Sequence, residues 1–317
     1  MRYKILELLK STPGFVSGED IGERFNVSRA AVWKNIARLK EEGYNIESVS
    51  NRGYRFLNDN DILNKFEIGI ENCVYFDETD STNDQAKRIA AEGCDDKLLV
   101  TCGKQLHGKG RLGRTWDDKG ENACMSFVFK PDIPPFEAPK LTLVAGLAIA
   151  DALHSYTGLK LGIKWPNDIT AGGKKICGIL TEMSAEIDKI NYVVVGIGVN
   201  VNCTDFDGEL KEKATSLALC LGHKSKRSEV IRICADYMFK YYDKFCKYGF
   251  AAFTDEYNRK CINVGKAVKA IYKSCDRTGI AKGVNDDGAL IIQDGDGKLF
   301  EVTSGEVSLR LENNNYA

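Results

Sequence analysis

The stretch GKQLHGKGRLGRTW, residues 103–116, combines glycines with basic side chains and ends on a tryptophan. Glycine allows the backbone to approach a ligand closely. Lys109, Arg111 and Arg114 favour an anion as that ligand, either a phosphate or a carboxylate. The indole of Trp116 is suited to stacking on a planar group. The segment therefore predicts a site for an anionic molecule, with a flexible basic surface loop as the alternative.

Two nucleotide-binding motifs resemble this stretch, and neither fits it. Gly108, Gly110 and Gly113 match the fingerprint G-x-G-x-x-G, which must open a helix inside a βαβ unit. Residues 115–121 are mostly polar and residues 125–129 have a strand pattern, so we expect no helix there. The P-loop motif fails as well, because Gly110 stands where its magnesium-binding Ser or Thr belongs.

The chain around this loop alternates between strand and helix patterns. Apolar residues at helical spacing predict helices over residues 140–156 and 228–248. Short apolar runs predict strands at residues 74–76, 98–101, 162–165, 178–183 and 192–201. This order indicates one mixed α+β domain, which we place at residues 65–260.

Four other segments of this domain carry polar or small residues where a strand or helix begins or ends. They are STND at 81–84, KWPND at 164–168, KKICGIL at 174–180 and GIGVN at 196–200. Each has an ordinary structural explanation, namely a helix N-cap, an Asx turn, a charged hairpin turn and close strand packing. Taken singly, none of them decides between a ligand site and simple architecture.

Residues 1–62 predict a small helical unit that is closed by a hairpin. Ser28 is placed to cap a third helix, and Val32, Ile36 and Leu39 form the apolar side of that helix. Alternating residues on both sides of an Asn-Arg-Gly turn then predict the hairpin. Helix–turn–helix units of this kind insert their last helix into the major groove of DNA.

The third helix of this unit, residues 28–40, carries four cations and no acid, although the whole chain has a formal net charge of −1. Contact with DNA phosphates requires such a local charge. We expect DNA contacts from five residues: Arg29, Lys34, Asn35, Arg38 and Arg52. The alternative is a solvated basic helix. Because one unit of this size binds weakly, we expect a homodimer that reads two half-sites of operator DNA.

The pattern changes again after residue 263. About five short strands follow within about 50 residues, separated by Asp-Gly turns and without helical periodicity. We therefore predict a third domain at residues 263–312, with the architecture of a small β-barrel or sandwich.

The composition narrows the class of protein. Eleven cysteines are scattered without C-x-x-C spacing, and the three histidines form no cluster with them. This pattern argues against a metal site and favours buried thiols in a reducing compartment. The longest apolar runs are far shorter than the ~20 residues of a membrane span. We expect a soluble cytoplasmic protein that has no membrane contact and no metal-ligand set.

Taken together and in this order, the segments resemble the biotin protein ligase family. The matching segments are residues 81–83, 108–116, 164–168, 175–180 and 196–200, with a further match at 305–310. With the N-terminal unit added, the chain is similar to the bifunctional members of that family, which are both ligases and repressors of the biotin operon. The resemblance covers nearly the whole chain, and it is specific because five motifs occur in register.

The resemblance implies an α+β multidomain fold. Its parts are a winged helix–turn–helix domain over residues 1–62, a class II synthetase-like ligase domain over 65–260 and an SH3-like β-barrel over 263–312. It implies a biotin–protein ligase that forms biotinyl-5'-AMP from biotin and ATP with Mg²⁺. The biotinyl group then passes to a lysine of a biotin carboxyl carrier protein, and biotinyl-AMP promotes repression. A ligase without repression, a regulator without catalysis and a lipoyl ligase remain as alternatives.

The resemblance also assigns site residues. Biotin is expected to contact Ser81, Thr82, Asn83, Gln105, Lys109, Gly110, Arg111, Lys175 and Gly178. The nucleotide is expected to contact Arg114, Trp116, Asn167, Asn200 and Arg310. The chain departs from the family at Lys109, where Arg is usual, and at Leu112, where a basic residue is frequent. The bidentate fork of Arg is lost at position 109, although the charge is kept.

The implied chemistry needs alignment and charge screening more than a base. A carboxylate is already ionised at neutral pH and attacks the α-phosphate of ATP directly. Lys175 and Arg111 are the candidates for stabilising charge as pyrophosphate leaves. Asp168 is the candidate base for the acceptor lysine. Because the mixed anhydride hydrolyses readily, we expect residues 107–116 to close over it as a lid.

Overall fold

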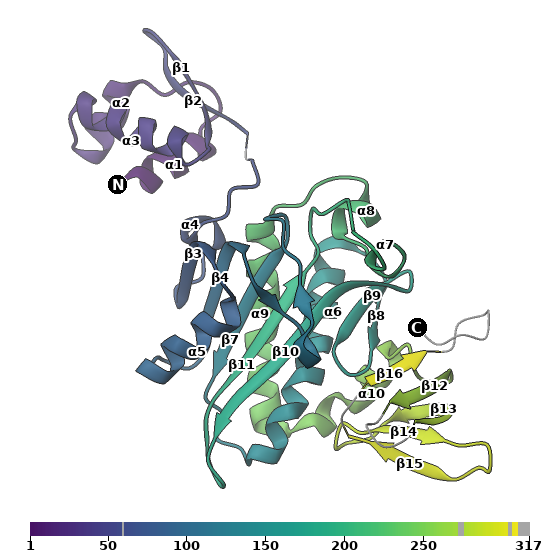
Figure 1. The fold of residues 1–317 in the computed structure, drawn as a ribbon. Coiled ribbons are helices and arrows are strands. Elements are labelled where there is room, and N and C mark those ends of the chain that lie inside the picture. Colours follow the sequence, from purple (N-terminus) through teal and green to yellow (C-terminus); the bar gives the residue numbers. More distant parts are fainter. Residues whose placement is uncertain (59, 272–275, 304–305, 310–317) are drawn as a thin grey trace. The chain divides into compact units, whose positions relative to one another are not determined.

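The computed structural model describes the chain except for residues 59, 272–275, 304–305 and 310–317 (Figure 1). It divides into two compact units, Met1–Ile68 and Gly69–Ala317. Arg310, which was predicted to contact the nucleotide, is one of the residues outside this description. No helix in the described part of the chain is long and apolar enough to cross a membrane.

The first unit is a helix–turn–helix followed by a two-stranded wing. Its elements are α1 (Arg2–Ser11), α2 (Gly18–Phe25), α3 (Arg29–Glu41), β1 (Asn45–Val49), β2 (Gly53–Asn58) and α4 (Lys65–Ile68). Ser28 caps α3 by accepting a hydrogen bond from the backbone N–H of Ala31 at 3.2 Å, as the sequence predicts. Asn26 ends α2 in the left-handed region with φ 52°, which turns the chain toward α3.

The core of this unit comes from one face of each helix. Val32, Ile36 and Leu39 of α3 are buried against Ile5 and Ile21 of the first two helices. The apolar stripe at i, i+4 and i+7 thus faces inward, as its spacing predicts. The opposite side of α3, with its cations, remains in solvent within this unit.

The second unit is built on a seven-stranded sheet. Its strands are β3 (Cys73–Thr79), β4 (Leu98–Gln105), β7 (Ala123–Phe129), β8 (Leu161–Lys164), β9 (Asp168–Ala171), β10 (Lys174–Ala185) and β11 (Ile190–Val199). They are ordered β3-β4-β7-β11-β10-β9-β8. Only β3 and β4 run parallel, because α5 (Thr82–Glu92) makes the crossover between them.

Helices cover both faces of this sheet. On one face lie α6 (Leu141–Thr157) and α9 (Arg227–Tyr248), seen behind the strands in Figure 1. Phe127 of β7 packs on that side against Phe239 of α9, with ring centroids 5.6 Å apart. Its neighbour Ser126 points to the other face and reaches the first turn of α5. The alternation along β7 therefore separates the aromatic core from the polar face on which the site forms.

The remaining helices of this unit are short. They are η1 (Arg111–Gly113), η2 (Pro135–Lys140), α7 (Leu210–Lys213), α8 (Leu217–Leu221), η3 (Phe250–Phe253) and α10 (Thr254–Lys260). The small strands β5 (Gly108–Lys109) and β6 (Thr115–Trp116) pair with each other and flank η1. No α-helix follows the last glycine of this loop, as the sequence predicts, because the chain continues through β6 to β7.

The C-terminal part is a five-stranded antiparallel sheet. Its strands are β12 (Ala267–Ile271), β13 (Arg277–Val284), β14 (Leu290–Gln293), β15 (Leu299–Val302) and β16 (Glu306–Leu309), in the order β15-β14-β13-β12-β16. Among the described residues this order is open, so the barrel is not closed, although the arrangement is compatible with the SH3-like class. Gly288, between β13 and β14, accepts a hydrogen bond from the buried indole N–H of Trp165 at 3.1 Å. The turn between β13 and β14 thus contacts the KWPND segment, which follows β8 of the seven-stranded sheet.

Candidate active site

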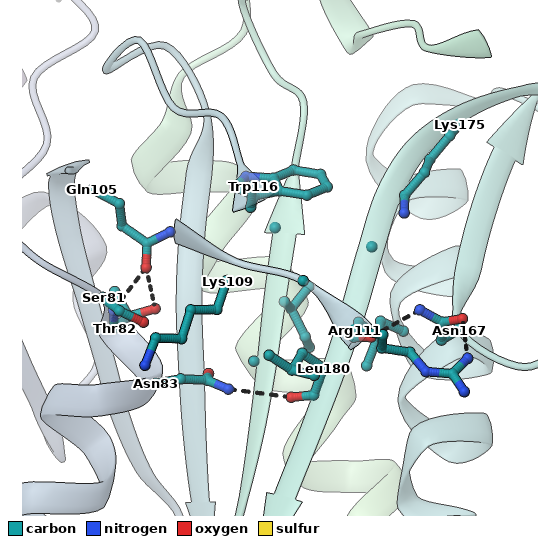
Figure 2. A pocket seen from close by; sticks show the side chains of 16 residues that line it. Ser81, Thr82, Asn83, Gln105, Lys109, Arg111, Trp116, Asn167, Lys175 and Leu180 are labelled. Atoms are coloured by element: carbon teal, nitrogen blue, oxygen red, sulfur yellow. Dashed lines mark hydrogen bonds between the residues drawn. The ribbon is translucent and has the colours of Figure 1, made fainter. Parts of the chain in front are cut away.

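A pocket opens on the polar face of the large sheet, beside the first turn of α5 (Figure 2). It has a volume of about 470 Å³ with its open mouth included. Ser81, Thr82 and Asn83 form one side, residues 107–116 cross above, and Asn167 and Lys175 stand on the far side.

Two glycines of the central strand β11 make room for the pocket's side chains. A Cβ on Gly196 would lie 2.1 Å from Oδ1 of Asn83, and a Cβ on Gly198 would lie 2.4 Å from Cε2 of Trp116. Neither distance is compatible with a side chain. The small residues at the end of β11 therefore allow Asn83 and the Trp116 indole to lie directly on the sheet.

The first turn of α5 is fixed by a buried polar network. Gln105 accepts hydrogen bonds from the N–H of Thr82 at 2.7 Å and from its hydroxyl at 3.0 Å. The hydroxyl of Ser126 lies 2.8 Å from the Thr82 hydroxyl and 2.6 Å from Oδ1 of Asn83. Ser81 occupies the N-cap position but makes no capping hydrogen bond with its side chain. Gln105 takes over that role, which leaves Ser81 to line the pocket.

Two cations line the pocket beside the KWPND segment. Arg111 donates a hydrogen bond to Oδ1 of Asn167 at 2.8 Å, so η1 is joined to the KWPND segment. Lys175 forms an ion pair with Asp168 at 2.6 Å, and its ammonium lies 5.8 Å from the centre of the Trp116 ring. The segment that follows the strand β8 thus holds both cations in place, and both line the cavity.

Lys109 points in a different direction from these two cations. Its ammonium lies 2.7 Å from Oδ2 of Asp84 in α5. Figure 2 shows its side chain extending from the loop toward Asn83. Lys87, one turn further along α5, pairs with the same Asp84 at 3.0 Å and with Glu182 of β10 at 2.7 Å.

Burial sets the ionisation of several groups near the site. Burial raises the pKa of the Cys102 thiol to about 12, and the nearby Asp118 adds to the shift. Burial also raises the pKa of Cys124 well above its usual value. The two cysteines pair across β4 and β7, and Asp118 accepts a hydrogen bond from the N–H of Gln105 at 2.8 Å. These cysteines are therefore protonated packing groups rather than nucleophiles.

The pocket brings together the residues predicted for biotin. All nine line it: Ser81, Thr82, Asn83, Gln105, Lys109, Gly110, Arg111, Lys175 and Gly178. Two of the residues predicted for the nucleotide, Trp116 and Asn167, line it as well. Two others do not. Arg114 lies exposed on the loop, and the side chain of Asn200 donates to the carbonyl of Thr215 at 3.0 Å, beside the pocket.

Some pocket residues were not among the predicted site residues. Leu180 supplies an apolar side chain to the lining, and Gly196 and Gly198 supply its floor; Ile179 and Ile197 also border the pocket, but their side chains are buried. The available signal was the period of two along the strands, which places Gly178 and Leu180 on one face of β10. In the described part of the chain, no group of three or more His, Cys, Asp or Glu side chains is arranged to hold a metal ion.

Four of the five residues predicted to contact DNA are exposed. Arg29, Lys34 and Arg38 of α3 are exposed, as is Arg52 in the wing, whose guanidinium lies 4.3 Å from the centre of the Phe15 ring. The amide of Asn35 instead donates to the carbonyl of Ala31 at 2.7 Å, back along its own helix.

Sequence reasoning missed one exposed aromatic residue on the same helix. Trp33 is 65% exposed and lies outside the apolar stripe of α3. An aromatic residue out of phase with that stripe was the signal that could have found it.

Comparison with known proteins gives matches along the chain. Models of three protein families match it: the HTH domain at residues 2–55, the biotin/lipoate A/B protein ligase family at 75–200 and the biotin protein ligase C terminal domain at 264–310. The chain is 34% identical to the bifunctional ligase/repressor BirA of Bacillus subtilis (strain 168), with 98% of each chain covered. It is 27% identical to the protein of the same name from Escherichia coli (strain K12), covering 97% of this chain and 96% of that one.

A solved structure matches the second unit. The biotin protein ligase from Aquifex aeolicus in complex with biotin and ATP has a TM-score of 0.67 and 30% sequence identity. The match covers 76% of this chain and 99% of that chain.

Proposed function

The chain belongs to the biotin protein ligase family of bifunctional ligase/repressors, and from this we propose how its pocket works. We propose that it joins biotin to ATP as biotinyl-5'-AMP and transfers the biotinyl group to a lysine of a biotin carboxyl carrier protein. We further propose that it binds operator DNA through its first unit when biotinyl-AMP is bound. The observation that carries this proposal is that the nine residues assigned to biotin by the family resemblance line one pocket.

The polar network at α5 is suited to the ring end of biotin. Ser81, Thr82 and Asn83 offer donors and acceptors at one end of the pocket, and Leu180 offers an apolar side chain for the aliphatic chain. This arrangement directs a ligand's carboxylate toward the cations at the other end. We therefore assign the α5 side of the pocket to the biotin rings.

The adenylation step then takes place between Lys175 and Arg111. A carboxylate oxygen of biotin attacks the α-phosphorus of ATP, and the bond to the pyrophosphate oxygen breaks. Negative charge builds on the phosphate oxygens, and the two cations stabilise it. Asn167 and Asp168 keep these cations in position. Mg²⁺ would be held by the phosphates of ATP and would screen their charge.

The transfer step uses the same enclosure. The acceptor lysine loses a proton, its amine attacks the acyl carbon, an amide forms and AMP leaves. Asp168 is our candidate for the proton acceptor, although in the ligand-free chain it is paired with Lys175. Residues 107–116 limit the entry of water to the mixed anhydride while the acceptor is absent.

Repression requires contact of the first unit with DNA. The exposed cations of α3 and of the wing support phosphate contact, with α3 in the major groove. We propose a homodimer, because two copies of this small unit are needed to read an operator of two half-sites. We place the protein in the cytoplasm on the basis of its scattered cysteines.

One experiment tests both activities with the full chain. The chain is incubated with Mg²⁺, ATP, a carrier domain and either biotin or lipoate, and the mass of the carrier is measured. We expect a biotinyl mass increase and no lipoyl increase. In parallel, duplexes are selected from a random DNA pool with and without biotin and ATP. Selection of the same duplexes in both conditions would contradict ligand-dependent repression, and a lipoyl product would contradict the ligase assignment.

A further inference from the structure

Lys109 occupies an unexpected place for a ligand-binding cation. It lies on the loop that crosses the pocket, yet its ammonium is 2.7 Å from Oδ2 of Asp84. The Asp84 side chain is 18% exposed, whereas that of Lys109 is 49% exposed. The contact therefore joins a largely buried carboxylate of α5 to an exposed side chain of the loop.

The carboxylate is fixed by a network on the sheet side. Lys87 bridges Asp84 and Glu182, at 3.0 Å and 2.7 Å respectively. Glu182 also accepts a hydrogen bond from the amide of Asn83 at 2.8 Å. Asp84 is thus held by its own helix and, through Lys87, by β10. A group held in this way loses little further side-chain freedom when Lys109 binds to it.

The ionisation of Asp84 agrees with this arrangement. Partial burial by itself would raise the pKa of its carboxyl group. The hydrogen bonds from Lys109 and Lys87 outweigh that effect and hold the pKa below its ordinary value. Asp84 is therefore a carboxylate at neutral pH and attracts the loop cation.

We propose that Asp84 and Lys109 form a tether that holds residues 107–116 over the pocket before any ligand binds. Asp84 is then a positioning residue, and it acts on the ligand only through the loop. This inference rests on the proposed function, because it assigns a cause to the closing of the lid over the ligand site. It also explains why position 109 tolerates a lysine, since a single ion pair does not need the bidentate fork of Arg.

The tether changes the cost of binding. A loop that is ordered in advance loses less conformational entropy when ligand enters. Because Lys109 is half-exposed, its pair with Asp84 is a surface ion pair. Such a pair shifts the equilibrium constant for opening of the loop by about two- to fivefold. An effect of that size alters how long an intermediate is retained without being essential for the fold.

Hydrogen–deuterium exchange on the full, ligand-free chain tests the tether. The variants are Asp84→Asn, Lys109→Gln and the double variant, with Lys109→Arg as the conservative change. Lys97→Gln is the matched control, because it removes another lysine–aspartate ion pair, with Asp243, and leaves Asp84 and its network intact. We expect exchange in residues 106–116 to rise two- to fivefold in each single variant and no further in the double variant. Lys109→Arg and Lys97→Gln should exchange in this segment like the unmodified chain.

Two results would overturn the tether. One is wild-type exchange of this segment in Asp84→Asn, and the other is a double variant in which the two effects add. A second measurement links the tether to the ligand. Biotinyl-5'-AMP formed in the active site should leave the Asp84→Asn chain two- to fivefold faster than the unmodified chain, and equal release would contradict a role in retention. If the unmodified chain forms no adenylate, the proposed function fails, while the exchange data still decide whether the loop is tethered.

Discussion

The contact between Gly198 and Trp116 gives a prediction whose size follows from the structure. An alanine Cβ at position 198 would lie 2.4, 2.7 and 2.8 Å from Cε2, Cζ2 and Nε1 of the indole. Gly198 pairs with Gly178 on one side and with Cys124 on the other, so its backbone cannot withdraw. Its φ is not in the left-handed region, so alanine causes no backbone strain there. The indole must therefore move out of the pocket floor.

The cost of that movement sets the expected loss of activity. Insertion of a methyl group into a well-packed site costs about 1–3 kcal/mol. If this cost falls on the bound state, biotin-dependent exchange of pyrophosphate into ATP slows by about 5- to 150-fold, at about tenfold per 1.4 kcal/mol. Steady-state exchange rates measure this loss, and circular dichroism checks that the variant is folded.

A matched glycine controls for the substitution itself. Gly295 lies in open space with an ordinary φ, so Gly295→Ala should exchange pyrophosphate at the rate of the unmodified chain. Wild-type exchange by a folded Gly198→Ala chain would refute the placement of the indole on β11. Equal losses in both variants would show that the effect does not come from the pocket.

Three further predictions concern single side chains. Lys175→Ala should abolish biotin-dependent pyrophosphate release, because it removes a cation from the phosphate end of the pocket; near-wild-type turnover would exclude that role. Arg111→Gly breaks the link to Asn167, so the adenylate should escape and label bystander proteins, and an unchanged labelling pattern on a blot would count against the lid. Iodoacetamide at pH 8 should modify the exposed Cys220 and leave Cys102 unmodified, because a thiol whose pKa is about 12 is almost entirely protonated. Peptide mass spectrometry would show this, and rapid alkylation of Cys102 in the folded chain would contradict its burial.

Features that depend on neighbouring residues could be predicted from the sequence. The cap at Ser28 and the inward stripe of α3 follow from residues within seven positions of one another. The helix α6 (Leu141–Thr157) matches the pattern predicted at 140–156 to within one residue at each end. The absence of a helix after the glycine loop also followed from local sequence. Such features need no knowledge of the rest of the fold.

Features that depend on distant residues could not be predicted from the sequence. Asn83 and Gly196 are more than 100 positions apart, and only the strand order places one upon the other. The partner of Lys109 was equally hidden, because a lysine and an aspartate can pair wherever the fold allows. Ser81 was predicted as an ordinary N-cap, and the competing acceptor from Gln105 could not be foreseen. Resemblance to a family supplied the grouping of these segments, and the structure supplied the contacts that hold them.

The central claim is that this pocket makes an acyl-adenylate of biotin. The full chain is incubated with biotin, ATP and Mg²⁺ but without a carrier protein, and the small molecules released by denaturation are measured by mass spectrometry. The account predicts biotinyl-5'-AMP in an amount close to that of the chain, and its loss in Lys175→Ala. Absence of biotinyl-5'-AMP from the folded, unmodified chain, or formation of lipoyl-5'-AMP in its place when lipoate competes, would contradict the account.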